Sequence, residues 1–123
     1  GISSSMVSGV TTPAPVLIEL ARLSDEDAME ALESSLVEVE NVTVCPMDDQ
    51  YVLYDQWRVL LDPAASCDDE TATICIGETA GYDEIDPPSL VGSTLSRVTG
   101  TLRYHYLATP GWIIVPRHAT DLQ

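Results

Sequence analysis

The chain contains no lysine and no phenylalanine, and only five of its 123 residues are basic. All five are arginines, against 20 aspartates and glutamates, so the formal net charge is −15. Proteins that bind nucleic acids draw most of their affinity from lysine and arginine contacts with phosphates. A charge of this sign therefore argues against nucleic acids and anionic membranes as partners, and it predicts a solvated acidic surface such as that of a salt-adapted protein.

The sequence also has no long apolar run. None approaches the roughly 20 residues that a membrane helix needs. Membrane insertion is therefore not expected. The hydrophobic fraction of 45% is nevertheless that of a folded chain with a core. We expect one domain over residues 16–123, preceded by a linker or extended arm over residues 1–15, which are rich in Ser, Thr, Gly and Pro.

No catalytic constellation can be recognised in the sequence. No serine lies in a Gly-x-Ser-x-Gly setting, which argues against nucleophilic catalysis of that type. The two histidines, His105 and His118, have no third ligand at zinc-binding spacing. We therefore predict a protein that is not an enzyme.

Three cysteines are too few for a disulfide-rich scaffold, and no Cys-x-x-Cys motif occurs. Cys67 and Cys75 flank an acidic segment, where a bridge would staple a surface loop, as in exported proteins. Cys45 follows the expected first strand and is a candidate partner for either of them. Three reduced thiols are the remaining alternative.

The acidic segment between the cysteines contains Asp68, Asp69 and Glu70. Calcium takes six to eight oxygen ligands, so these carboxylates are candidate Ca2+ ligands. No EF-hand spacing accompanies them, and a solvated loop without metal is the favoured interpretation.

Residues 36–44 form the longest β-prone run of the chain. Successive side chains of a strand point to opposite faces, so Val37 and Val39 share one face whereas Val42 and Val44 share the other. All four valines can be buried only if the alternation breaks once. We predict a β-bulge near residues 40–41, which bends the strand and lets it pair on both sides of a small barrel.

A short helix is expected before this strand, with Ser24 as its N-cap, Asp27 three residues later, and an end near residues 34–35. Residues 16–23 are apolar enough for a short strand or an arm packed on the body. Residues 50–61 predict two short strands separated by a turn at residues 55–56.

The second half of the chain begins with a long irregular acidic segment, residues 62–89, which contains a brief strand at residues 73–76. A strand over residues 90–104 follows, and Gly100 offers a place for a bend. A turn at residues 107–111 then leads to the last strand, residues 112–115, and a short polar tail.

This order of elements resembles the OB-fold modules that accompany the catalytic domains of large secreted bacterial nucleases and that occur on other bacterial surface proteins. The matching blocks are residues 32–44 at the first strand, and residues 91–102, 113–117 and 121–122 at the closing hairpin. The resemblance implies a mostly β fold, a five-stranded Greek-key barrel with one short N-terminal helix and a long acidic loop. It also implies export and membership of a multidomain chain, and it carries over no catalytic residue.

OB barrels commonly bind oligonucleotides or oligosaccharides on one face. The candidate ligand-binding residues are the aromatic side chains and their neighbouring arginines: Trp57, Arg58, Arg103, Tyr104, Tyr106 and Trp112. The alternative is that the aromatic residues fill the core of a protein that lacks phenylalanine. An aromatic platform with so little positive charge suits a glycan or a peptide better than DNA.

Two functions follow from these features. The first is a non-enzymatic, extracellular OB-fold module for interaction or assembly on the bacterial surface, with a protein partner or copies of itself. In this hypothesis residues 16–23 are candidates for addition to a neighbour's sheet edge. The alternative is an accessory nucleic-acid- or polysaccharide-binding module of a secreted hydrolase.

Overall fold

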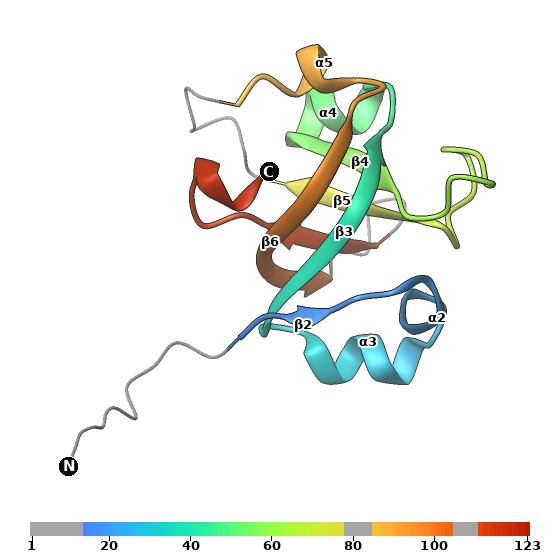
Figure 1. The fold of residues 1–123 in the computed structure, drawn as a ribbon, viewed down its shortest axis with the longest axis vertical. Coiled ribbons are helices and arrows are strands. Elements are labelled where there is room, and N and C mark those ends of the chain that lie inside the picture. Colours follow the sequence, from blue (N-terminus) through green and yellow to red (C-terminus); the bar gives the residue numbers. More distant parts are fainter. Residues whose placement is uncertain (1–13, 78–84, 105–110) are drawn as a thin grey trace.

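The computed structural model describes residues 14–77, 85–104 and 111–123 (Figure 1). Its main feature is a closed mixed barrel of five strands: β3 (Leu36–Val44), β4 (Gln56–Leu60), β5 (Thr73–Gly77), β6 (Thr94–Tyr104) and β7 (Trp112–Val115). Their order around the barrel is β3-β4-β5-β7-β6, and β6 pairs with β3 to close it. Only the β5–β7 pair of the barrel is parallel. The mostly β fold is thus confirmed, and the barrel is compatible with an OB-like fold.

A sixth strand and several short helices surround the barrel. Strand β2 (Val16–Leu17) adds to β3 in parallel. The helices are α2 (Leu20–Leu23), α3 (Glu26–Leu32), α4 (Asp49–Tyr54), α5 (Pro87–Leu90) and the 3-10 turn η1 (Ala119–Asp121). The expectation of a single helix was therefore too simple. Among the described residues, no helix is long and apolar enough to cross a membrane.

The N-terminal helix begins one residue later than predicted. Asp25, not Ser24, is the N-cap of α3, and its carboxylate accepts a hydrogen bond from the Ala28 N–H at 3.2 Å. Ser24 instead follows α2, and its hydroxyl donates to the Leu20 carbonyl. The helix ends at Leu32, and Ser34 turns the chain into β3 with a φ of 72°.

The first of the two strands predicted over residues 50–61 is wrong, because residues 49–54 form helix α4. The turn predicted at residues 55–56 is present, with Asp55 at a φ of 55°, and β4 follows it. Tyr51 packs against the core while Val52 and Leu53 are exposed. The composition of a short apolar run fits a helix and a strand equally well. In the described part of the chain, no strand pairs with residues 49–54.

The acidic segment contains more structure than predicted. The brief strand expected at residues 73–76 is confirmed as β5, and all five of its residues are buried. It lies between β4 and β7 in the barrel. A strand buried on both faces shows a continuous apolar run, which is a weak signal when the run is short.

The alternation of β3 breaks near residues 40–41, as predicted, but the predicted β-bulge is wrong. Val37, Val39, Val42 and Val44 are all buried, and Asn41 adopts a left-handed φ of 54°. The pairing with β6 keeps one register across the break, so β3 has gained no extra residue relative to β6. Instead β6 breaks at the same place, since residues 96–97 are exposed opposite residues 40–41.

The break separates two neighbours on the other edge of β3. Before it, Val37 pairs with Val16 of β2; after it, Thr43 pairs with Leu60 of β4. The first strand thus pairs on both sides, as predicted. Ile18, which is 2% exposed, follows β2 and donates its N–H to the Glu38 carbonyl at 2.8 Å. The apolar arm therefore packs on its own barrel.

The C-terminal tail is docked on the barrel. Leu122 forms a bridge with Val98 of β6, and the Gln123 N–H donates to the Arg97 carbonyl at 2.9 Å. The buried Asp121 carboxylate accepts from the Arg117 backbone N–H at 2.8 Å and from its guanidinium at 3.1 and 3.2 Å. These contacts close the tail into a turn against β6. The sequence predicted only a short polar tail here.

Gly100 lies where β6 pairs with β3 and begins to pair with β7. A Cβ at this position would overlap the Val115 carbonyl and lie 2.8 Å from Ile114 Cγ2. We expect Gly100→Ala to lower the free energy of unfolding by about 1–3 kcal/mol through overpacking, measured by urea denaturation. The control, Ser96→Ala at an exposed position of β6, should stay within about 0.5 kcal/mol of wild type. Equal stability of the two variants would contradict this account of the strand crossing.

Asp121 should make stability depend on pH. Burial by itself would raise the pKa of Asp121, but the hydrogen bonds and charge of Arg117, with the charge of His118, hold the pKa below its usual range. A pKa lowered in the folded state stabilises the fold above the unfolded pKa of about 3.9, and this contribution is lost as the pH falls through the folded pKa. We expect Asp121→Asn to cost about 1–2 kcal/mol at neutral pH. In urea denaturation the difference should shrink with acidification, and a constant difference at all pH values would contradict this.

Candidate functional site

The structure separates the six residues predicted to bind a ligand. Trp57 is 1% exposed and belongs to the core. The Arg58 guanidinium donates to the Asp48 carboxylate at 2.9 Å and to the Cys67 carbonyl at 3.0 Å, so it connects two loops. Tyr106 lies outside the described residues. Arg103, Tyr104 and Trp112 remain together at the paired ends of β6 and β7.

Tyr104 and Trp112 form a cross-strand aromatic pair. They are register partners, with ring centroids 4.9 Å apart and an interplanar angle of 69°. Tyr104 is 53% exposed, whereas Trp112 is 9% exposed. The Tyr104 ring lies over Gly111, where a Cβ would come within 2.6 Å of its Cε1 atom. The glycine therefore permits the position of the ring.

These two rings form one wall of a pocket of about 230 Å3. The other wall is helix α3 with its C-cap: Glu26 and Glu30 lie in the helix, and Glu33 is the C-cap residue. Residues spaced by four positions lie on one face of a helix, so Glu26 and Glu30 share a face. We call this cavity the acid–aromatic pocket. The sequence predicts the aromatic half of this pocket but not its acidic half, because the packing of α3 beside the end of β6 is a tertiary contact.

A second candidate surface is the loop between β3 and β4. Its first residue, Cys45, forms a disulfide with Cys67, and its Asp48 is held by Arg58. The loop contains α4, which presents three consecutive exposed apolar residues: Val52 at 78%, Leu53 at 67% and Tyr54 at 45% exposure. We call these three residues the α4 patch. The sequence does not predict this patch, because the same residues were expected to form the first of the two strands over residues 50–61.

The disulfide resolves the choice among the cysteines. It joins Cys45 and Cys67 with a Cα–Cα distance of 5.8 Å, so the bridge between Cys67 and Cys75 is wrong. Cys75 lies in the buried strand β5 and keeps its thiol. Burial raises the pKa of Cys75 to about 12, which keeps the thiol protonated at neutral pH. The acidic segment therefore folds back to the end of β3. The order of residues along the chain does not show this contact.

Two carboxylates of the acidic segment, those of Asp62 and Asp69, close local turns. Asp69 accepts from the Thr71 hydroxyl at 2.6 Å and from the Thr71 N–H at 3.0 Å, and these bonds lower its pKa. Asp62 accepts from the Ala64 N–H in the same way. Across the described residues, no group of three or more acidic, cysteine or histidine side chains gathers in a way that would hold a metal ion. The geometry therefore adds no support for the calcium hypothesis.

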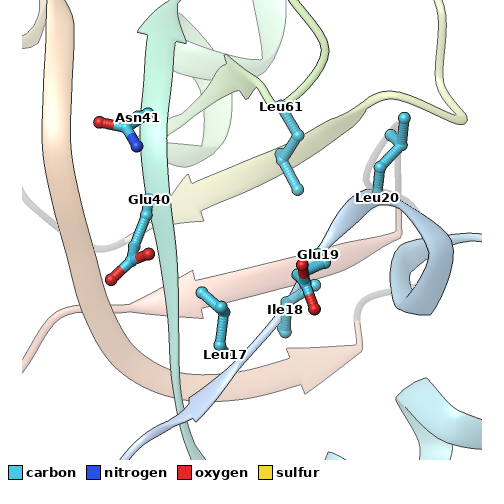
Figure 2. A pocket seen from close by; sticks show the side chains of 7 residues that line it. All are labelled: Leu17, Ile18, Glu19, Leu20, Glu40, Asn41 and Leu61. Carbon is cyan, nitrogen blue, oxygen red and sulfur yellow. The ribbon is translucent and has the colours of Figure 1, made fainter.

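Another cavity, of about 210 Å3, lies at the break in β3 (Figure 2). Its lining combines apolar side chains with two carboxylates and one amide: Leu17, Ile18, Leu20 and Leu61 with Glu19, Glu40 and Asn41. Beside it, burial and then the hydrogen bond and charge of Glu40 raise the pKa of Glu38, against the opposing charge of Arg97. These side chains supply neither a hydroxyl nucleophile nor an imidazole, so the cavity offers apolar contact and negative charge.

The cysteine pairing predicts a specific pattern of alkylation. Without reductant, the unfolded chain should react at a single thiol, mapped to Cys75 by peptide mass, and the native chain at none, because Cys75 is 0% exposed. Removing the disulfide with Cys45→Ser and Cys67→Ser should cost about 3 kcal/mol of unfolding free energy, given the 22-residue separation. Alkylation of Cys45 in the non-reduced chain would contradict the pairing.

No protein-family model matches the chain, and no curated protein sequence is significantly similar to it.

Proposed function

We propose that the chain is a non-enzymatic, exported module of OB-like architecture that serves interaction or assembly on the bacterial surface. The observation that supports this most directly is the α4 patch. Three consecutive apolar side chains exposed on a folded chain are unfavourable unless something covers them. Helix α4, which presents them, stands at one end of the barrel (Figure 1).

The loop that presents the patch is held at several points. The disulfide fixes its first residue, and the Cys45 N–H also donates to the Arg58 carbonyl at 2.9 Å. Arg58 holds Asp48, and the Tyr51 side chain packs on the core beneath the patch. A contact surface that is already ordered loses little conformational entropy on binding. This arrangement favours a docking role over a loop that is exposed by chance.

Export is supported by the disulfide, because such bonds persist in oxidising compartments. The acidic surface fits the same environment, since it favours solubility. Assembly by exchange of the N-terminal arm has less support, because β2 and Ile18 already occupy the edge of β3 in their own barrel. The proposal therefore places the contact at α4.

The alternative is an accessory module of a secreted hydrolase that binds a polysaccharide or a nucleic acid. The exposed Tyr104 ring favours this alternative in its glycan form, since rings of this kind stack on sugars and bases. The net charge of −15 opposes the nucleic-acid form.

Salt distinguishes the two functions. Copies that associate through an apolar patch repel one another through their acidic surfaces, so added salt should strengthen assembly. Binding to single-stranded DNA should weaken with salt. We expect sedimentation velocity to show salt-promoted self-association that the double substitution Val52→Ser, Leu53→Ser removes.

The matched control is Leu20→Ser, which alters an exposed leucine of α2, away from α4 in Figure 1, and should leave association unchanged. A monomer at every salt and protein concentration, combined with binding on a glycan array that the α4 substitutions leave intact, would favour the alternative.

A further inference from the structure

We propose that the acid–aromatic pocket binds a cationic side chain, arginine or lysine, in a basic segment of a protein partner. The pocket lies between α3 and the ends of β6 and β7, at the end of the barrel opposite the α4 patch (Figure 1). It is therefore a second surface, and its assignment does not depend on the role of α4.

The aromatic wall supplies the first part of the recognition. Cations are attracted to the faces of tryptophan and tyrosine rings. The T-shaped arrangement of Tyr104 and Trp112 leaves ring faces that the partner ring does not cover. Tyr104 is half exposed and positioned over Gly111, so a ligand can reach its ring without a change of the backbone.

The helical wall sets the charge of the occupant. Glu26, Glu30 and Glu33 are all exposed, and none of them forms an ion pair with another described residue. An anion or a neutral sugar at this place would leave three carboxylates uncompensated. A guanidinium or ammonium group instead meets a ring face and carboxylates together, which is the pairing that positive side chains favour.

Size and spacing favour a peptide over a small cation. A volume of about 230 Å3 lies below the roughly 300–1,000 Å3 of sites that enclose a whole small molecule, so the pocket suits one side chain. Glu26 and Glu30 lie one helical turn apart, about 6 Å along α3, and Glu33 follows at its C-cap. A segment with several basic residues can therefore place one in the pocket and others beside the helix.

The test uses a labelled Ser-Gly peptide that contains several arginines, and a counterpart with glutamine at those positions, followed by fluorescence anisotropy. We expect Glu30→Gln and Tyr104→Leu each to weaken binding of the arginine peptide about fivefold, which corresponds to about 1 kcal/mol. Tyr104→Phe keeps the ring and should bind within about twofold of wild type. The glutamine peptide should not bind.

The charge-matched control is Glu70→Gln, which removes one negative charge from the acidic segment, away from the pocket. Equal weakening of peptide binding by Glu30→Gln and Glu70→Gln would mean general charge attraction and would overturn the proposal. The proposal would also be overturned if Tyr104→Leu, with unchanged circular dichroism, bound the peptide as tightly as wild type. Competition by tetramethylammonium as effective as that of the arginine peptide would overturn the assignment to a protein segment. The Val52→Ser, Leu53→Ser variant should bind the peptide normally, which separates this result from the test of α4.

Discussion

The barrel closes through the pairing of β3 with β6, and the rest of the structure depends on how these two strands break together. Asn41 adopts a left-handed backbone, which asparagine tolerates better than most residues. Residues 40–41 and 96–97 turn outward on facing strands, so the register survives while the buried face of each strand changes. Without this shared break, either Val37 and Val39 or Val42 and Val44 would lose their places in the core. The same bend frees the outer edge of β3 to accept β2 at one end and β4 at the other.

The second constraint is the shortage of positive charge. With five arginines and no lysine, few cations are present to compensate 20 carboxylates. Three of the arginines hold structure: Arg58 joins two loops, Arg97 contacts Gln123 and Arg117 holds Asp121. Asp62 and Asp69 of the acidic segment close turns. Much of the remaining acidic surface therefore faces solvent uncompensated, which favours partners of positive charge and opposes polyanions.

The two candidate surfaces differ in chemistry and lie at opposite ends of the barrel (Figure 1). The α4 patch is apolar and is held by covalent and ionic contacts beneath it. The acid–aromatic pocket combines ring faces with carboxylates and admits a single side chain. Neither surface contains a nucleophile paired with a base among the described residues. Under the two proposals, a module with two such surfaces can connect two partners.

The amino-acid sequence by itself determined the strands, because the alternation of valines in β3, the apolar run of β5 and the residues of β4, β6 and β7 are local patterns. It also determined the place of the break, since burying all four valines of β3 requires one. Only the tertiary structure decided which cysteines pair, that residues 49–54 form a helix, and that the tail docks on β6. Each of these depends on contacts between segments far apart in the sequence. The acid–aromatic pocket has the same origin, because its glutamates and its rings meet only where α3 packs beside the ends of β6 and β7.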